Sequence, residues 1–368
     1  MGKVKPFDIS KRDVWEAFKR VKANRGAAGV DGQTITDFEA DLSNNLYMLW
    51  NRMSSGSYFP SPVRRVDIPK GDGGTRPLGI PTVTDRIAQE VVRRNLEPSL
   101  EPVFHADSYG YRPGRSAIDA VRQTRQRCWR YDFVLDIDVK GYFDNIDWEL
   151  LLKAVRFHTD CPWQLLYIDR WLRVPVQMEN SDIVPRSSGT PQGGVISPLL
   201  ANLFLHYVFD MWMTRKYPHI PFERYADDIV CHCNSAKAAQ ALLCALRARF
   251  ATCKLEMHPE KTKIVYCKDA NRRGDFAHTS FDFLGFTFRA RKTVWQGSIP
   301  AHGFMPAVSR KAMKSISQTI RGWRFHLRND KALNDLAEIA NRHVRGWINY
   351  YGSFYRTELS STLLRIDF

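Results

Sequence analysis

The chain has 368 residues, 44% of them hydrophobic, so it can hold one large domain or two to three smaller domains with an ample core. Its 54 Lys and Arg against 39 Asp and Glu give a formal net charge of +15, which favours a polyanionic partner, nucleic acid first, although charge alone does not exclude a role in solubility. Seven scattered cysteines without a C-x-x-C pair speak against a disulfide framework and a zinc ribbon, and no apolar run reaches the roughly 18 residues of a membrane-spanning helix.

The first predicted elements are a helix and a hairpin. Residues 13–23 have apolar side chains at helical spacing, and the Gly-rich stretch after them lacks P-loop or dinucleotide spacing, which predicts a loop.

Residues 63–81, "VRRVDIPKGDGGTRPLGIP", form two extended segments around a GDGG turn. Lys70 and Arg76 bracket this turn, so they are expected to project into the same space from adjacent strands. The alternative is a solvated loop tip, where basic residues are ordinary.

Two helices and a strand are predicted next. Thr82 and Ser116 are each followed three residues later by an acid, which predicts a capping box at each helix start. The stretch "FVLDIDVKGYFDNID" then predicts a strand whose apolar residues share one face, while Asp136 and Asp138 lie on the other. Gly141 allows a tight departure from the strand, and Asp147 can cap the helix that follows.

A Gly-rich loop, "SGTPQGG", leads into a long helix. Ser197 is the expected N-cap, with Pro198 at the first helical position. Most of this helix presents a broad apolar face. Asn202, His206 and Asp210 form a narrower polar stripe along it.

The stretch "RYADDIVCHC", residues 224–233, predicts two short strands with Asp227 and Asp228 at the turn between them. Two ionised carboxylates about 4 Å apart repel by roughly 4 kcal/mol at an effective dielectric constant near 20. The thiols of Cys231 and Cys233 share one strand face, but no second ligand pair follows, so buried packing is favoured over a metal site.

The last region is predicted to be helical and basic. Residues 290–368 hold thirteen Lys or Arg and five Asp or Glu, a concentration that favours a binding surface. An aromatic stripe in "NRHVRGWINYYGSFYR" is expected to belong to the core. Arg342, Arg345 and Arg356 fall on the other face and could follow a phosphate backbone.

Divalent cations would cancel the repulsion between the carboxylates. If the strand with Asp138 neighbours the hairpin with Asp227 and Asp228, the three acids converge, and hard oxygen ligands suit Mg²⁺. Two such ions about 3.5–4 Å apart can activate an attacking hydroxyl and stabilise a leaving pyrophosphate. Phosphoryl transfer also needs cationic clamps on the phosphates, which Lys70 and Arg76 could supply.

Together these segments resemble the bacterial group II intron-encoded reverse transcriptases, also called maturases. The resemblance runs nearly end to end, and nine segments in order at polymerase spacing make it specific. They are "RVKANRGAAGVDG", "IPKGDGGTRPLGIP", "DSYGYRPGRSAIDAV", "DIDVKGYFDNID", "SGTPQGGVISPLLANLFLH", "RYADDIV", "LEMHPEKTKIV", "FDFLGFTF" and "RGWINYYGSFYR".

The resemblance implies an α+β, right-hand polymerase with fingers, a palm and a helical thumb, in which an antiparallel palm sheet carries the YADD hairpin. It divides the chain into an N-terminal extension and fingers at 1–130, a palm at 131–289 with a fingers portion near 150–187, and a thumb, called domain X in this family, at 290–368. The chain stops at "STLLRIDF", so we expect no DNA-binding or endonuclease region within it.

The same resemblance implies the site residues. Asp138, Asp227 and Asp228, with the carbonyl of Val139, would hold two Mg²⁺, for which Mn²⁺ can substitute. Lys261, or alternatively Lys263, would protonate the leaving pyrophosphate. The implied nucleotide contacts are Lys70, Arg76, Phe143 and Gln192, and the implied nucleic-acid contacts are Arg112, Arg115, Gly193, Phe283, Leu284, Gly285, Arg342, Arg345 and Arg356. The bulk of Phe143, where a ribose 2′-hydroxyl would sit, would select deoxynucleotides.

The implied activity is RNA-directed DNA synthesis with deoxynucleoside triphosphates, on an RNA template such as the group II intron RNA and from a DNA or RNA primer. In the family, binding of the intron RNA assists splicing and retrohoming. We expect a bacterial cytoplasmic protein, without a signal peptide or a membrane partner, that is nucleoid-associated when engaged. The alternatives are a splicing maturase with an unused polymerase site, a relative exapted to phage defence or CRISPR adaptation, and an RNA-dependent RNA polymerase, which Phe143 disfavours. The oligomeric state is left open.

Overall fold

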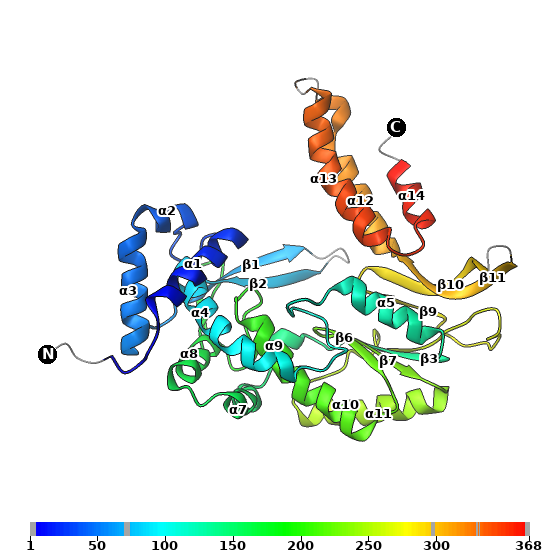
Figure 1. Ribbon diagram of the computed structural model, residues 1–368, viewed down its shortest axis with the longest axis horizontal. Coiled ribbons are helices and arrows are strands. Elements are labelled where there is room, and N and C mark those ends of the chain that lie inside the picture. The colour runs from blue at the N-terminus through cyan, green and yellow to red at the C-terminus, as the bar shows by residue number, and fades with distance from the viewer. Residues whose placement is uncertain (1–4, 70–73, 296–298, 329, 331, 365–368) are drawn as a thin grey trace. The chain divides into compact units, whose positions relative to one another are not determined.

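The computed structural model describes residues 5–69, 74–295, 299–328, 330 and 332–364, and the chain forms two compact units (Figure 1). The first unit comprises Met1–Ala106, Val139–Lys216 and Arg249–Glu256, and the second comprises Asp107–Asp138, Tyr217–Ala248 and Met257–Phe368. Helices and antiparallel strands are mixed in both units, which confirms the α+β class. Within the described residues, no helix is both long enough and apolar enough to cross a membrane.

The first unit packs helices around a small sheet with the strand order β2-β1-β4-β5. Its strands are β1 (Val63–Pro69), β2 (Thr75–Ile80), β4 (Val176–Gln177) and β5 (Ile183–Val184). Its helical elements are α1 (Lys11–Asn24), α2 (Ile35–Ala40), α3 (Leu42–Ser55), α4 (Val83–Leu100), the 3₁₀ turn η1 (Glu101–Val103), α6 (Tyr142–Asn145), α7 (Trp148–His158), α8 (Pro162–Leu172), α9 (Ser197–Leu205), the π-helical turn η2 (His206–Asp210) and α10 (Met211–Lys216).

The second unit contains a four-stranded antiparallel sheet with the order β6-β7-β3-β8 and a three-stranded sheet with the order β11-β10-β9. Its strands are β3 (Phe133–Ile137), β6 (Phe222–Tyr225), β7 (Asp228–Cys233), β8 (Lys263–Tyr266), β9 (Ser280–Phe283), β10 (Phe286–Trp295) and β11 (Ile299–Val308). Its helical elements are α5 (Ala117–Cys128), most of α11 (Ala236–Thr252), α12 (Arg310–Trp323), the 3₁₀ turn η3 (Phe325–Leu327), α13 (Leu333–Tyr351) and α14 (Thr357–Leu363).

Several predicted helix starts are confirmed, because a short polar side chain accepts a backbone N–H at each of them. The hydroxyl of Thr82 accepts from the Asp85 N–H at the start of α4, and Ser116 and Asp147 cap α5 and α7 in the same way. The prediction that Ser197 is an N-cap was wrong. Ser197 is already helical, and its hydroxyl oxygen lies 2.7 Å from that of Thr190 and accepts its hydrogen bond.

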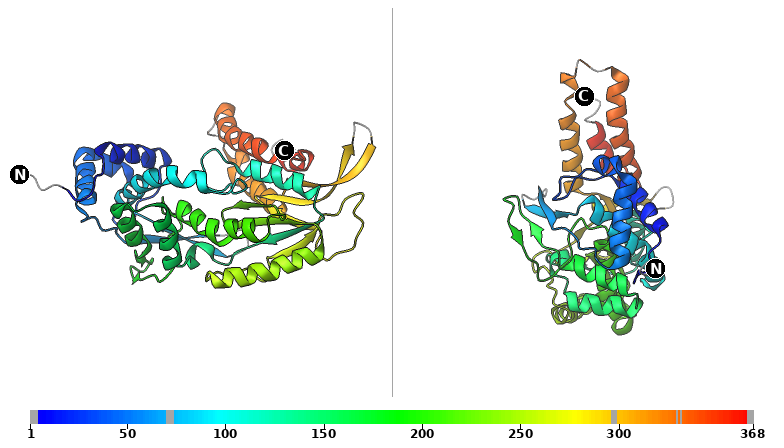
Figure 2. Two further views of the ribbon diagram at one scale, coloured as in Figure 1. Left: turned by 60° about the horizontal axis from the view of Figure 1, so that its bottom comes forward. Right: turned by 90° about the vertical axis from the view of Figure 1, so that its left-hand side faces the viewer.

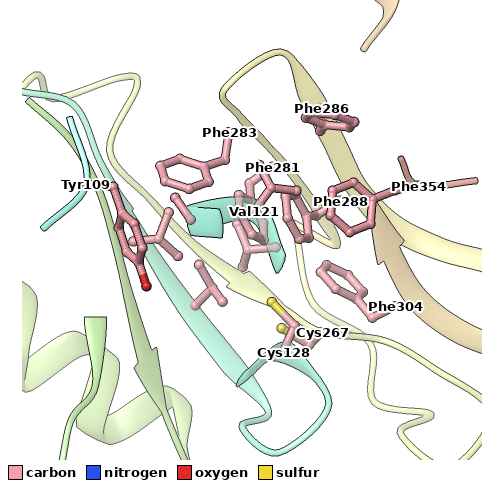
Figure 3. Close-up of a cluster of buried hydrophobic side chains, with 14 residues drawn as sticks. Tyr109, Val121, Cys128, Cys267, Phe281, Phe283, Phe286, Phe288, Phe304 and Phe354 are labelled. Atoms are coloured by element: carbon pink, nitrogen blue, oxygen red, sulfur yellow. The ribbon is translucent and has the colours of Figure 1, made fainter. Parts of the chain in front are cut away.

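The four-stranded sheet of the second unit is covered on both faces, by α5 on one and α11 on the other (Figures 1 and 2). Sequence alternation predicted one apolar face on β3, yet Val134, on the opposite face from Leu135, is also fully buried. Val134 joins a cluster that β9, β10 and β11 fill with stacked phenylalanines, among them Phe281 and Phe288 at 4.7 Å between ring centroids (Figure 3). Packing on both faces therefore fixes the position of the sheet that carries the carboxylates at its edge.

The predicted helical region at 290–368 needs a correction at its start. Phe286–Trp295 and Ile299–Val308 are the paired strands β10 and β11, and the helices begin at Arg310. The sequence "FTFRARKTVW" alternates between side chains on two faces, which fits a strand. The division of the chain into fingers, palm and thumb stays a prediction.

Candidate active site

The predicted hairpin of "YADD" is confirmed. Tyr225 on β6 pairs with Asp228 on β7, so the turn consists of Ala226 and Asp227. Ala226 has φ 56°, in the left-handed region that a two-residue hairpin turn requires. The carboxylate of Asp227 is half-buried and that of Asp228 is exposed.

The strand that precedes Asp138 is the neighbour of this hairpin. β3 pairs antiparallel with β7, and Ile137 is opposite Ile229. Asp138 directly follows one member of this pair and Asp228 directly precedes the other, so the register brings the two acids together at one edge of the sheet. Asp138 and Asp228 also line one cavity of about 300 Å³. The convergence expected from the sequence therefore holds for these two residues.

Asp136 lies in the same cavity, and sequence reasoning gave it no role. The pKa of its carboxyl is raised to about 8, first by burial and then by the negative charges of Asp228, Asp138 and Asp282, while the positive charge of Lys263 acts against the rise. The signal was present in the sequence, since strand alternation puts Asp136 on the same face as Asp138. What the sequence did not show was how closely the acids are packed.

Lys261 is also part of this cavity. Its Nζ lies 3.8 Å from Oδ2 of Asp138, and both side chains remain partly exposed. The loop that carries Lys261 is held in place because the His258 N–H donates to the Asp138 carbonyl over 2.8 Å. The structure thus brings Lys261 to a predicted catalytic acid, while Lys263 lies on β8 beside Asp136.

These donors fit a divalent cation. Carboxylate oxygens are the ligands Mg²⁺ prefers, and Asp136, Asp138, Asp228 and Asp282 line one cavity. Among the described residues no group of three or more His, Cys, Asp or Glu is gathered as closely as a metal cluster requires. Val139, whose carbonyl the resemblance adds to the ligands, is buried and directly follows Asp138.

A buried arginine supports the hairpin. The side chain of Arg224 is fully buried, and its Nη1 donates to the carbonyl of Ala226 over 3.2 Å. The backbone of Arg224 is bonded on both sides to the segment before α5, because its N–H donates to Asp107 and its carbonyl accepts from Tyr109. The turn that carries Asp227 is therefore held by side-chain and main-chain contacts.

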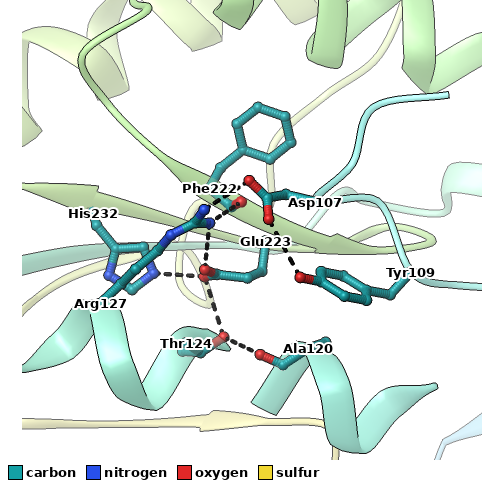
Figure 4. Close-up of polar contacts among 8 residues, drawn as sticks. All are labelled: Asp107, Tyr109, Ala120, Thr124, Arg127, Phe222, Glu223 and His232. Atoms are coloured by element: carbon teal, nitrogen blue, oxygen red, sulfur yellow. Dashed lines mark hydrogen bonds and ion pairs between the residues drawn. The ribbon is translucent and has the colours of Figure 1, made fainter. Parts of the chain in front are cut away.

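Glu223, the neighbouring residue on β6, is the centre of a buried polar network (Figure 4). Its carboxylate accepts hydrogen bonds from Nη1 of Arg127 at 2.6 Å and from the hydroxyl of Thr124 at 3.1 Å, and it lies 2.6 Å from Nε2 of His232. Arg127 also donates to Asp107 over 2.8 Å. A buried carboxylate is tolerated only with such partners, so this network ties α5 to the hairpin strands.

The cysteine pair that flanks His232 is buried, as expected. Cys231 and Cys233 lie on the sheet face opposite Glu223, where burial raises the pKa of the Cys231 thiol well above its usual range and that of Cys233 to about 12. His232 meanwhile faces Glu223. These thiols contribute packing at the sheet.

The predicted nucleotide contacts lie in the first unit, except that Lys70 falls outside the described residues. Arg76 Nε donates to Oε1 of Gln192 over 2.7 Å, and Nε2 of Gln192 lies 3.5 Å from Asp144. Two residues 116 positions apart in the sequence are thus side by side. Gly193 has φ 116°, and a Cβ there would lie 2.6 Å from the Gly79 carbonyl, so the close approach that it allows is to β2.

Phe143 is on the short helix α6 and is only 6% exposed. Its ring packs edge-on against Tyr142 at 5.4 Å, and its carbonyl accepts from the Thr190 N–H. The "SGTPQGG" loop is thereby fastened to α6. The position of Phe143 is fixed by these contacts, whereas its role as a gate stays a prediction.

The predicted nucleic-acid contacts differ in their exposure. Arg115 is exposed, but Arg112 is mostly buried and its Nη1 donates to the Ser108 carbonyl over 2.7 Å. Phe283 is likewise buried in the aromatic cluster. Burial disfavours a direct contact of either side chain with nucleic acid. The guanidinium of Arg112 is bonded to a backbone carbonyl, and the ring of Phe283 packs in the core.

Leu284 and Gly285 form the turn between β9 and β10, with φ 51° and 80°. The carbonyl of Leu284 accepts from the Tyr350 hydroxyl over 2.8 Å, and the carbonyl of Gly285 accepts from the Ser309 N–H. The turn is thus tied to α13 and to the start of α12. Sequence inspection did not anticipate these contacts.

The three basic residues of the predicted phosphate track are exposed but do not share one helix. Arg342 and Arg345 are on α13, which ends at Tyr351, and Arg356 directly precedes α14. The predicted helical spacing does not reach Arg356, because α13 ends at Tyr351 and Tyr355, with φ 41°, lies in the non-helical segment that follows. Of the aromatic stripe, Phe354 is buried, as expected for core.

Comparison with known proteins agrees with this geometry. The family model described as "Reverse transcriptase (RNA-dependent DNA polymerase)" matches residues 68–288, more than half of the chain. A second model, "Group II intron, maturase-specific domain", matches residues 313–366.

Similar proteins occur in bacteria and in yeast. Protein YkfC of Escherichia coli (strain K12) is 33% identical over 296 residues, which cover 69% of this chain and 77% of that protein. The group II intron-encoded protein LtrA of Lactococcus lactis subsp. cremoris is 36% identical over 193 residues, which cover 52% of this chain and 32% of LtrA. The putative COX1/OXI3 intron 2 protein of Saccharomyces cerevisiae is 27% identical over 267 residues, which cover 72% of this chain and 30% of that protein.

The match to LtrA and to the yeast protein thus spans about a third of the length of each. The two family models and the geometry of the acids point to the same conclusion. The chain belongs to the reverse transcriptase family, the RNA-dependent DNA polymerases, and carries a group II intron maturase-specific domain.

Proposed function

We propose that this chain extends a DNA or RNA primer on an RNA template, using deoxynucleoside triphosphates, by metal-assisted phosphoryl transfer. The observation that supports this most directly is the shared cavity of Asp138 and Asp228 at the edge of one sheet. Asp227 precedes Asp228 in the turn of the same hairpin. Binding alone does not require carboxylates to be brought together against their electrostatic repulsion.

Asp138, Asp227 and Asp228, with the carbonyl of Val139, would hold two Mg²⁺. When bound, such ions supply charge stabilisation for the attacking and leaving oxygens of an in-line displacement. Lys261, whose Nζ lies 3.8 Å from Oδ2 of Asp138, would deliver a proton to the departing pyrophosphate. Arg76 and Gln192 would bind the triphosphate, and Phe143 would exclude a 2′-hydroxyl.

The test is RNA-templated extension of a labelled DNA primer by the purified chain, with Mg²⁺ or with a chelator. We expect Asp138→Asn and Asp228→Asn each to reduce synthesis to background while template–primer affinity changes by less than about threefold, since the acids serve the reacting phosphates. Asp160→Asn, an exposed acid outside the cavity, is the matched control and should retain full activity. A variant that extends primers at the wild-type rate would remove its residue from the site.

A second candidate function is binding of intron RNA to assist splicing and retrohoming. The supporting observation is the match of residues 313–366 to the group II intron maturase-specific domain. Its test is protein-dependent splicing of a group II intron RNA by wild type and by Asp228→Asn. Splicing that persists in the polymerase-dead variant would separate the two functions, and loss of splicing with intact RNA binding would contradict a maturase role independent of the acids.

A further inference from the structure

The first unit contains a groove that none of the proposed catalytic residues lines. It lies between α7, the π-helical turn with α10, and the end of α11, and it has a volume of about 550 Å³. That volume is within the range of sites that take a small ligand or several side chains of a partner.

The floor of the groove is apolar. Leu150 and Ala154 on α7 form one side of it, and Phe204, Val208 and Met211 form the other side. At its edge stands Phe157, which is 77% exposed. An exposed aromatic ring beside an apolar hollow is a typical anchor of a protein–protein interface.

The wall opposite α7 is rigidly built around the π-helical turn. Arg249 donates from Nε to the Val208 carbonyl and from Nη2 to the Tyr207 carbonyl, each over 3.0 Å. The hydroxyl of Tyr207 lies 2.6 Å from Nε2 of His158, which connects this wall to α7. π-helical turns are uncommon and occur frequently at functional sites.

The polar residues at the rim carry one sign of charge. Lys153, Arg215 and Lys216 are exposed, and no Asp or Glu is among the residues that line the groove. In the part of the chain that the structure describes, none of these three cations has an acidic partner within ion-pair distance. The groove thus offers an apolar floor under an unneutralised positive rim.

We propose that this groove docks a partner protein through an amphipathic helix with apolar anchors and acidic flanks. The anchors would fill the hollow beside Phe157, and the acids would face Lys153, Arg215 and Lys216, which is the helix-in-groove mode of recognition. A nucleic-acid strand fits less well, because bases are recognised by hydrogen bonds along their edges, and the side chains of Leu150, Ala154, Phe204, Val208 and Met211 have no hydrogen-bonding groups.

The test uses the full chain and a short synthetic helical peptide, with leucine at i, i+3, i+4 and i+7 and glutamate elsewhere, followed by fluorescence anisotropy. We expect saturable binding that falls about tenfold or more with Phe157→Ser and with Arg215→Glu. Phe59→Ser and Arg20→Glu are matched controls, because Phe59 is 70% exposed and neither residue lines the groove. Primer extension should be unchanged in Phe157→Ser.

Several results would overturn the proposal. One is no binding of the peptide, and another is equal binding of a scrambled peptide or equal loss in the two controls. Displacement of the peptide by single-stranded RNA, with RNA affinity lowered by Phe157→Ser, would assign the groove to nucleic acid. Self-association that Phe157→Ser abolishes would identify a second copy of the chain as the occupant.

Discussion

At the scale of single residues, the main feature of this protein is a group of carboxyl side chains at one edge of a sheet. Asp136, Asp138 and Asp228 line the same cavity, and the pKa of the Asp136 carboxyl is raised to about 8. Burial is the first cause of this rise, so the Asp136 carboxyl holds its proton at neutral pH. Half-buried Asp138 and exposed Asp228, which meet where β3 and β7 pair, are the proposed ligands for a cation.

The proposed gate can be tested at Phe143. If its ring blocks a ribose 2′-hydroxyl, Phe143→Ala should raise the efficiency of ribonucleotide relative to deoxynucleotide incorporation by about tenfold or more, since a steric contact of this size is worth 1–3 kcal/mol. The measurement is kcat/KM for matched ribo- and deoxynucleoside triphosphates. Phe59→Ala serves as the control, and an unchanged ratio in Phe143→Ala would refute the gate.

The cysteines provide a second test at this scale. Burial raises the pKa of the Cys128, Cys231 and Cys233 thiols, so at pH 8 they hold little reactive thiolate, whereas Cys244 is exposed. We expect iodoacetamide to modify Cys244 first in the native protein, as mapped by mass spectrometry, and Cys244→Ser to remove the fast phase. Modification of Cys231 before unfolding would contradict the packing described for β7.

At the scale of elements, loops and turns place the functional side chains, and backbone contacts hold them. The "SGTPQGG" loop is bonded to α6 through Phe143 and to β2 through Gly79. It brings Gln192 to Arg76 as a result. The hairpin of Asp227 is held in a comparable way by Arg224.

Gly193 allows a test of the first arrangement. Gly193→Ala combines a strained φ of 116° with a Cβ 2.6 Å from the Gly79 carbonyl, so it should lower the free energy of unfolding by more than about 3 kcal/mol. Gly32→Ala is the matched control, because Gly32 has φ 69° with open space around it and should cost only about 1 kcal/mol. Urea denaturation measures both, and equal losses would show that the contact with Gly79 is unimportant.

At the scale of the whole molecule, charge is concentrated where the maturase-specific domain was matched. Residues 290–368 carry thirteen Lys or Arg and five Asp or Glu. Arg342 and Arg345 remain exposed there on α13, and Arg356 remains exposed directly before α14. This distribution favours an extended contact with a phosphate backbone over one localised pocket.

Replacing Arg342, Arg345 and Arg356 together by glutamine should weaken RNA binding and flatten its dependence on salt. Each phosphate contact contributes about 0.7–0.9 to the slope of log affinity against log salt concentration, so the slope should fall by about 2 if all three contribute. Filter binding across a salt series measures it. Replacement of the exposed Arg156, Lys237 and Arg247 is the control, and a slope unchanged from wild type would mean that the three arginines are merely solvated.

Local signals in the sequence were sufficient for several elements. Thr82 and Ser116 cap their helices as predicted, because a capping hydrogen bond joins residues three positions apart. Alternation on either side predicted the hairpin, but with Asp227 and Asp228 at its turn, whereas the turn is Ala226 and Asp227 and Asp228 begins β7. Ser197 failed as a cap because its hydroxyl is engaged by Thr190, a residue of the preceding loop. The burial of Arg112 and Phe283 could not be read from local sequence, because burial depends on the whole fold, and their predicted contact with nucleic acid stays a prediction.

The sequence by itself determined the family, the antiparallel hairpin of the two adjacent acids, and the position of Asp138 at the end of an apolar strand. Each of these depends on a short-range sequence pattern. Tertiary structure decided the rest. It placed Asp138 and Asp228 in one cavity with Asp136, joined Arg76 to Gln192, and buried the Glu223 network behind the hairpin. Pairing between distant strands, and the low local dielectric of a packed interior, depend on contacts that no short stretch of sequence contains.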